Sequence, residues 1–264
     1  MSYMRRYLLA LGLFALAGSM SEDVEGALIA GASVDGGGTV FAIDNSGVST
    51  CGSSAIGPCQ LPDADPTVGS LVINGFGLGG DILIQATVQT QDVATGPGTF
   101  NRLDSTGTQV TNNGAVSHTI AVVVSADNFV GPTNTASVTG AGQWSHLGGG
   151  FGDSEIEMTW WNDPANVLAD LSFLGTPQPG NLLATFSDVA GPNNPDSFSY
   201  NGGPFAVNDP GLFSMTLQFE GTIAPGVRLT GREQTEIKPL AVSLPTSLQL
   251  MIAGAGLVSA SFLG

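Results

Sequence analysis

The sequence predicts an all-β, jelly-roll-like antiparallel β-sandwich of about eight to twelve strands, between an N-terminal signal helix and a C-terminal hydrophobic helix. Apolar and polar residues alternate with a period of two in several segments of the body. Gly and Pro, 38 and 15 of the 264 residues, punctuate these segments without a fixed repeat. No body segment sustains helical periodicity for three turns, and 164–171 comes nearest to doing so.

The clearest alternation runs through 213–219, where Phe, Met and Leu side chains share one side of the chain. Segments 155–161 and 81–89 alternate in the same way, which predicts half-buried strands. Segment 120–124 is apolar throughout and is typical of a central strand. Gly-Pro, Asn-Gly and Asp-Pro steps between these segments predict the turns.

The first 21 residues have the three parts of a secretory signal. Arg5 and Arg6 precede an apolar run over 7–17, and small residues follow it. The apolar run is too short to cross a bilayer core of about 30 Å. Cleavage after Ser21 places small residues at both required positions, and cleavage after Gly26 is the alternative. The sequence therefore predicts an exported protein.

Residues 239–264 form a second terminal segment, which carries no charge. Its last part, 247–264, is apolar and punctuated by glycine, and it would span about 27 Å as a helix. A membrane-engaging tail and a buried terminal helix or strand both fit this composition. The remaining residues, 27–238, suit one folded domain, which we expect to be the β-sandwich.

The body of the chain is strongly acidic. Between positions 27 and 227, acidic residues outnumber basic residues 17 to one, the single basic residue being Arg102. Nucleic-acid binding is excluded as a function, because neutralising phosphates requires clustered Lys and Arg. Such an acidic body stays soluble by self-repulsion and is able to recruit divalent cations.

Cys51 and Cys59 are the two cysteines of the chain. Beside an export signal, this pair predicts a structural disulfide that closes a short loop, worth about 2–3 kcal/mol. Asp63 and Asp65 follow in a loop and supply the oxygen ligands that calcium prefers. A structural calcium site and ordinary turn-forming acids are the two interpretations, and no other cofactor is expected.

Glu155 and Glu157 lie two residues apart on one predicted strand, so both face solvent about 7 Å apart. Paired carboxylates at such distances hydrolyse glycosidic bonds. The pair resembles the acidic motif of laminarinase-like jelly-roll glycosidases, but Thr159 or Trp160 stands where the last carboxylate of that motif belongs. The two histidines give no nucleophile–base set by their spacing. The sequence therefore predicts a protein that is not an enzyme.

Trp144, Trp160 and Trp161 are the three tryptophans of the chain. Trp160 shares its side of the strand with Ile156 and Met158, so we expect it in the core. Trp161 then faces outward, where an exposed indole is able to stack on a sugar ring. Trp161 and the nearby Trp144 are the candidate ligand-binding residues, and ordinary packing under a loop is the alternative.

The segment 241–248 resembles the PEP-CTERM sorting signal in its VPLPA-type variant, through Val242, Leu244 and Pro245 before the apolar stretch. This resemblance implies processing by an exosortase at the membrane and association with exopolysaccharide outside the cell. The central Pro-Glu-Pro and the terminal arginine cluster of that family are absent here. Three body segments also resemble one PEP-CTERM group: 160–166, 208–217 and 231–238.

These observations predict a non-enzymatic, exported cell-surface or extracellular-matrix protein. Its expected partners are an exosortase-type sorting machinery, exopolysaccharide or matrix components, and the membrane through the C-terminal tail. A carbohydrate-binding module, supported by calcium, is the alternative function. A polysaccharide hydrolase is the third hypothesis.

Overall fold

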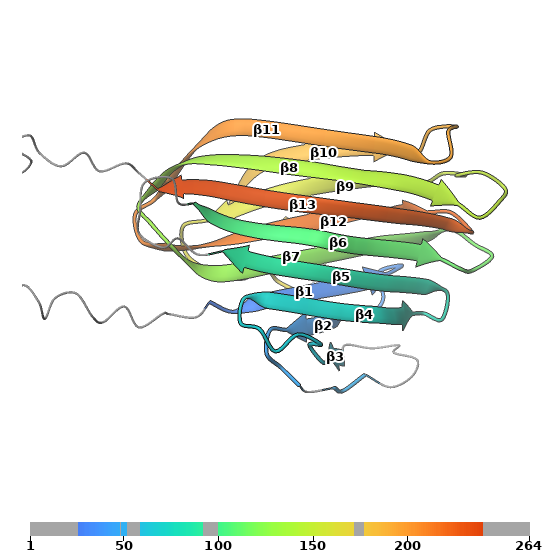
Figure 1. Cartoon of the computed structure of the whole chain (residues 1–264), viewed down its shortest axis with the longest axis horizontal. Coiled ribbons are helices and arrows are strands. Elements are labelled where there is room, and N and C mark those ends of the chain that lie inside the picture. The colour runs from blue at the N-terminus through green and yellow to red at the C-terminus, as the bar shows by residue number, and fades with distance from the viewer. Residues whose placement is uncertain (1–25, 48, 52–58, 92–99, 172–176, 240–264) are drawn as a thin grey trace, which may run out of the picture.

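The computed structural model describes residues 26–47, 49–51, 59–91, 100–171 and 177–239. In these residues the chain forms thirteen strands and no helix. The strands make two sheets that pack face to face (Figure 1). All paired strands run antiparallel except β2 and β3, which are parallel. The predicted all-β sandwich is confirmed.

One sheet has seven strands and the other has six (Figure 1). The order of the first is β10 (Asn181–Val189), β9 (Glu155–Asp163), β12 (Leu212–Ile223), β7 (His118–Val130), β1 (Leu28–Val34), β2 (Val40–Ile43) and β3 (Cys59–Leu61). The order of the second is β11 (Asp196–Asp209), β8 (Thr133–His146), β13 (Val227–Pro239), β6 (Asn101–Asn112), β5 (Ile82–Gln91) and β4 (Ser70–Leu78).

The structure contains more strands than the sequence predicts. β2 and β3 have four and three residues, too few to show a clear alternation. The strands β8 and β11 are rich in Ser, Thr, Asn and Gly, although Phe198, Tyr200, Phe205 and Val207 of β11 pack in or against the core. The segment 164–171 follows β9 as irregular chain and forms no helix.

The core lies between the two sheets and is built by the predicted alternation. Phe213, Met215 and Leu217 of β12 are fully buried, as is Trp160 of β9. The Trp160 indole stacks on the ring of Tyr200 from the opposite sheet, with 5.4 Å between ring centroids. Aromatic contacts of this kind connect the two sheets near their β10 and β11 edges.

Cys51 and Cys59 form the predicted disulfide, with their Cα atoms 5.0 Å apart. The bond anchors the start of β3, which extends the sheet beyond β2. The predicted signal over 1–21, the tail over 239–264 with its helix, and the motif residues Val242, Leu244 and Pro245 lie outside the described residues, apart from Pro239 at the end of β13. Within the described ranges, no helix is long and apolar enough to cross a membrane.

Candidate functional site

Strand β9 lies second from one edge of the seven-stranded sheet, between β10 and β12. Every second side chain of its first half is buried between the sheets. The side chains that face away from the core are Glu155, Glu157, Thr159 and Trp161. The period-two pattern placed these four residues correctly on one face.

A groove opens on this face at the start of β9. Glu157 lies directly opposite Glu220 of β12 on one side and opposite Ser187 of β10 on the other. The groove has a volume of about 300 Å³. We call it the acidic groove, and its lining includes Thr119, Glu155, Glu157, Ser187, Glu220 and Thr222.

The carboxylates of Glu157 and Glu220 repel each other across the two strands. Burial, and after it the negative charge of Glu157, raises the pKa of Glu220. Like charges directly opposite in an antiparallel pair destabilise the sheet. A ligand that donates hydrogen bonds to both carboxylates would therefore bind favourably between them. Glu220 was not recognised from the sequence, because only the strand register brings it beside Glu157.

Trp161 lies on the same face, farther along β9, and its side chain is half-buried. Its indole Nε1 donates a hydrogen bond to the Thr159 hydroxyl at 3.1 Å, so the ring leans along the strand toward the acidic groove. Across the strand pair lies Leu182 of β10, which is 50% exposed. The outward orientation predicted for Trp161 is confirmed, and it provides an aromatic and apolar area beside the carboxylates.

The irregular segment 164–171 covers part of this face over β12 and β7. Its carbonyl at Val167 accepts a hydrogen bond from the Ser214 hydroxyl at 2.6 Å, and its N–H at Ala169 donates to the Ser125 hydroxyl at 3.1 Å. Ser214 and Ser125 point away from the core, yet they are almost fully buried beneath the segment. The open part of the face thus includes β9, β10 and the adjoining ends of β12 and β7 that line the acidic groove.

Trp144 does not belong to this face, so the prediction that it contributes to a binding surface is wrong. It is fully buried on the inner side of β8, where it packs against Phe198 with 6.3 Å between ring centroids. Its Nε1 donates to a carboxylate oxygen of Asp188 at 2.8 Å. That hydrogen bond satisfies the indole N–H, so no polar group of Trp144 is buried without a partner. Because the ring is fully buried, a ligand cannot reach it.

Asp63 and Asp65 shape the loop that precedes β4. One oxygen of Asp63 accepts from the backbone N–H groups of Asp65 and Val72, both at 3.0 Å. Asp65 accepts from the N–H of Thr67 and the hydroxyl of Ser70, and these hydrogen bonds lower its pKa. Both carboxylates thus organise local backbone. Calcium binding at Asp63 and Asp65 stays a prediction.

Asp44 lies beside this loop and interacts with Asp63. Burial raises the pKa of Asp44, the charge of Asp63 raises it further, and the hydrogen bond from the Gly69 N–H works in the opposite direction. Across the described parts of the chain, no group of three or more His, Cys, Asp and Glu residues is arranged to hold a metal ion.

His118 is the first residue of β7. Its Nδ1 lies 2.7 Å from a carboxylate oxygen of Asp35, and its Nε2 lies 3.9 Å from one of Asp81. Burial raises the pKa of Asp35, but the hydrogen bonds with His118 and with the Thr119 N–H outweigh it, so the net shift is downward. The contact joins the end of β1 to the start of β7.

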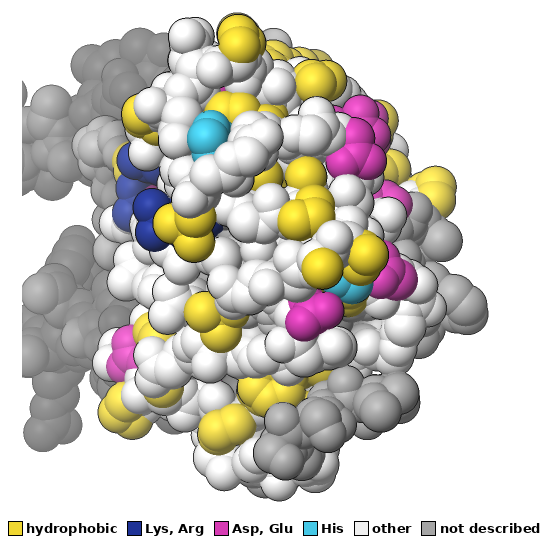
Figure 2. Space-filling view, turned by 90° about the vertical axis from the view of Figure 1, so that its right-hand side faces the viewer, with side chains coloured by type: hydrophobic (Ala, Val, Ile, Leu, Met, Phe, Trp, Pro, Cys, Tyr) yellow, Lys and Arg dark blue, Asp and Glu magenta, His cyan; other side chains and the backbone are white. Residues whose placement is uncertain are grey.

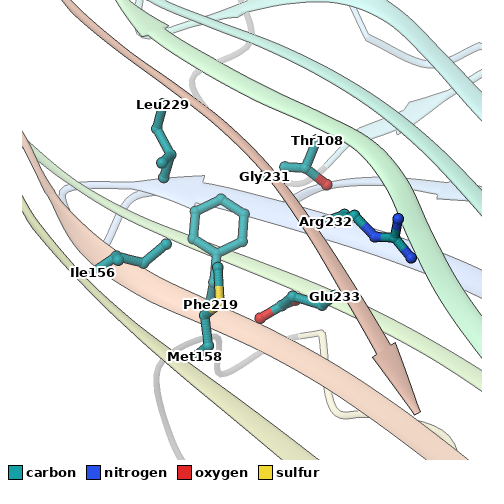
Figure 3. Close-up of a pocket in the computed structure, with 8 residues that line it drawn as sticks. All are labelled: Thr108, Ile156, Met158, Phe219, Leu229, Gly231, Arg232 and Glu233. Atoms are coloured by element: carbon teal, nitrogen blue, oxygen red, sulfur yellow. The ribbon is translucent and has the colours of Figure 1, made fainter. Parts of the chain in front are cut away.

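A small cavity lies between the sheets, beneath Gly231 of β13 (Figure 3). Its volume is about 10 Å³, which is enough for one water molecule. The carboxyl group of Glu233 points into it, together with Met158 and Phe219 (Figure 3). Burial raises the pKa of Glu233 to about 8, and one of its oxygens has no hydrogen-bond partner among the described residues. The cavity is too small for a sugar or any other organic ligand.

Known protein families and curated proteins give no match to this chain. Solved structures with some likeness include the carbohydrate-binding module TmCBM61 with β-1,4-galactotriose, at 10% identity over 50% of this chain and 71% of that chain, with a TM-score of 0.29. A family 11 carbohydrate-binding module from Clostridium thermocellum with a mixed-linked tetrasaccharide is 13% identical over 68% and 95%, with a TM-score of 0.27. The mannan-recognising TmCBM27 is 6% identical over 65% and 90%, with a TM-score of 0.27. Similarities this distant assign no ligand to this chain.

Proposed function

We propose that this protein is an exported, non-enzymatic β-sandwich that binds polysaccharide on the open outer face of its seven-stranded sheet. The observation that carries the proposal is that the half-buried indole of Trp161 and the acidic groove share one face of neighbouring strands. Residues on strands are held more rigidly than residues on loops, which reduces the entropy lost when a ligand binds.

The chemistry of the face suits a sugar chain. Sugar hydroxyls donate hydrogen bonds, and the carboxylates of Glu155, Glu157 and Glu220 accept them as charge-assisted bonds. The apolar faces of sugar rings pack on aromatic side chains, for which Trp161 is available. A hydroxyl placed between Glu157 and Glu220 would also relieve their repulsion, so binding and electrostatic relief act together.

The sequence at the two ends and the disulfide support the exported part of the proposal. A disulfide such as Cys51–Cys59 is typical of proteins outside the cytosol, and residues 1–21 have the parts of a secretory signal. Exosortase processing of the tail over 239–264 belongs to the same proposal, on the resemblance of its motif. A cell-surface or matrix location would bring the acidic groove to exopolysaccharide.

Polysaccharide hydrolysis is the second candidate function, and Glu220 is the observation that favours it. A glycosidase uses one carboxyl group with a raised pKa as general acid and an ionised partner as nucleophile or base. The raised pKa of Glu220 beside Glu157 meets the first condition. The groove is open to water along β10, where Val189 is 67% exposed, so binding is the function we favour.

Affinity electrophoresis of the secreted protein tests the proposal. The gels contain neutral galactan, mannan, xylan or β-glucan. We expect at least one polymer to retard the protein, and we expect Trp161→Ala to weaken that binding about tenfold, since an aromatic stacking contact contributes about 1 kcal/mol or more. Leu147→Ala is the control, because Leu147 is 86% exposed in the turn after β8 and does not line the acidic groove. Unchanged retardation of Trp161→Ala, or no retardation by any polymer, would refute the proposal.

The same samples distinguish binding from hydrolysis. If the protein releases new reducing ends from a retarding polymer and Glu220→Gln abolishes that release, the protein is a hydrolase and the non-enzymatic proposal is wrong. Retardation without any release of reducing ends supports the binding function.

A further inference from the structure

Every Lys and Arg in the part of the chain that the structure describes lies on one surface, the outer face of the six-stranded sheet. Arg102 belongs to β6, and Arg228, Arg232 and Lys238 belong to β13. β13 is a central strand, and its alternation points Glu233 inward and these three cations outward. Figure 2 shows the Lys and Arg side chains gathered on one side of the molecule. We call this surface the cationic face.

No arginine of the cationic face forms an ion pair within 4 Å with a carboxylate of the described residues. Arg228 donates to the Ser145 hydroxyl at 3.2 Å, and Arg232 donates to the Gln234 side-chain carbonyl at 3.4 Å. Arg102 lies over the ring of Phe100, at 5.6 Å from its centroid. In a chain with 22 acidic and six basic residues, carboxylate partners are abundant. Because none of the three arginines is in a direct ion pair, their guanidinium groups are available to an external anion.

The surroundings of Arg228 and Arg232 are flat and polar. Both arginines are exposed, and most of their outward-facing neighbours on the three central strands are hydroxyl or amide side chains, the exceptions including Ala141 and Asp104. These neighbours are Gln109 and Thr111 of β6, Gln143 and Ser145 of β8, and Thr230 and Gln234 of β13. No segment comparable to 164–171 makes contacts over this part of the sheet within the described chain.

The cationic face also contains two carboxyl groups, which offset part of its positive charge. Glu236 lies 3.7 Å from the ammonium group of Lys238 and neutralises it. Asp104 is almost fully buried, and burial raises its pKa, whereas the charges of Arg232 and Arg102 lower it. Asp104 therefore offsets part of the charge of Arg232 and Arg102, and the exposed guanidinium groups are those of Arg228 and Arg232.

We propose that the cationic face binds an acidic polysaccharide, a linear sugar chain that carries carboxylate groups and lies along β13. Charge complementarity is the argument, since guanidinium groups recognise carboxylates by paired hydrogen bonds. Arg228 and Arg232 are four residues apart on one side of a strand, a separation of about 13 Å, so they engage carboxylates on separate sugar units. The hydroxyl and amide side chains between them hydrogen-bond to sugar hydroxyls. This surface is on the opposite sheet from the acidic groove and does not depend on the proposed function.

A binding experiment with the full-length protein tests this proposal. It compares the affinity for polygalacturonate with the affinity for the same polymer after methyl esterification. We expect polygalacturonate to bind and its neutral ester to bind at least tenfold more weakly, with affinity falling as the salt concentration rises. The double variant Arg228→Gln/Arg232→Gln is expected to lose at least tenfold in affinity for polygalacturonate. Lys238→Gln is the matched charge control and should change affinity less than threefold, because Glu236 already neutralises that lysine.

Other outcomes would overturn the proposal. Equal binding of the methyl ester would remove the role of charge, and unchanged binding by the double variant would place the site elsewhere. Binding of duplex DNA as tight as that of polygalacturonate would show unspecific attraction of polyanions. Self-association lost in the double variant, without any polysaccharide binding, would identify the acidic face of a second copy as the partner. Trp161→Ala should leave polygalacturonate binding unchanged, so failure of this proposal and failure of neutral-polysaccharide binding remain distinguishable.

Discussion

The two outer faces of this sandwich are built from the same alternating strands, yet they present opposite surfaces. The seven-stranded sheet carries Glu155, Glu157 and Glu220 around a groove, and segment 164–171 covers much of the remaining face. The six-stranded sheet carries all the described Lys and Arg residues on a flat surface of hydroxyl and amide groups. Strand alternation decides which residues face outward, and the covering segment and the strand register decide what an approaching ligand meets.

The difference is clearest in the burial of polar residues. On the covered face, Ser125 and Thr216 are almost fully buried, and their hydroxyl groups lie 2.9 Å apart and hydrogen-bond to each other. On the cationic face, most outward residues of β8 and β13 remain half-buried or exposed, whereas Asp104 and Thr111 of β6 are buried. Substitutions on the two outer faces and in the interior between the sheets therefore test this comparison.

The largest expected effect concerns Glu233, which points from β13 into that shared interior. Its pKa is about 8 in the folded chain, against an ordinary value of 4.5. Between pH 4.5 and pH 8 the unfolded state has released the proton and the folded state retains it, so the free energy of unfolding falls by about 1.4 kcal/mol per pH unit. Above pH 8 this contribution is constant.

Urea denaturation of the wild type and of Glu233→Gln across pH 5 to 9 measures the effect. The amide of Gln is neutral at every pH, so we expect the fall in the free energy of unfolding between pH 4.5 and pH 8 to disappear in the variant. The side chains of the two outer faces are unchanged by this substitution. Glu236→Gln on the outward side of β13 is the control. Parallel pH profiles for the wild type and Glu233→Gln would show that the buried carboxyl group does not titrate in this range.

The second effect distinguishes the covered face from the open one. Ala169 is 7% exposed, and its N–H donates to Ser125 beneath the covering segment. Ala169→Asp would bury a charge there, and we expect it to lower the free energy of unfolding by about 2–4 kcal/mol. Ala141→Asp places the same carboxylate on the open face opposite Arg232, where the expected change is below about 0.5 kcal/mol.

Thermal and urea unfolding of both variants, at one pH and one salt concentration, compares these values. If Ala169→Asp is no more destabilising than Ala141→Asp, segment 164–171 does not pack on the sheet as described, and the contrast between the faces is wrong.

The smallest effect concerns the acidic groove. Glu157→Gln removes the charge opposite Glu220, so we expect it to stabilise the protein at pH 7 by about 0.5 kcal/mol and to lower the pKa of Glu220. The gain should vanish at low pH, where both carboxyl groups are protonated. Glu155→Gln is the matched control, because Glu155 lies opposite Thr222 and Val189.

NMR titration of the Glu220 carboxyl signal, with urea denaturation at pH 3 and pH 7, measures both quantities. An unchanged Glu220 pKa in Glu157→Gln would mean that burial alone raises it, and the repulsion across the groove would then be negligible.

The sequence by itself determined the fold class and the orientation of β9. A period of two in the side-chain pattern follows from strand geometry, so Trp160 was expected inside and Trp161 outside before any contact was known. The disulfide between Cys51 and Cys59 was also predictable, because two cysteines in a short loop have one pairing.

Only the tertiary structure decided how the strands combine into surfaces. The register of β9 against β12 sets Glu220 opposite Glu157, which are more than sixty residues apart in the sequence. The covering segment and the inward position of Trp144 likewise depend on which strands become neighbours. The physical reason is that alternation is a local property of the backbone, whereas register and sheet order are fixed by the packing of the whole core.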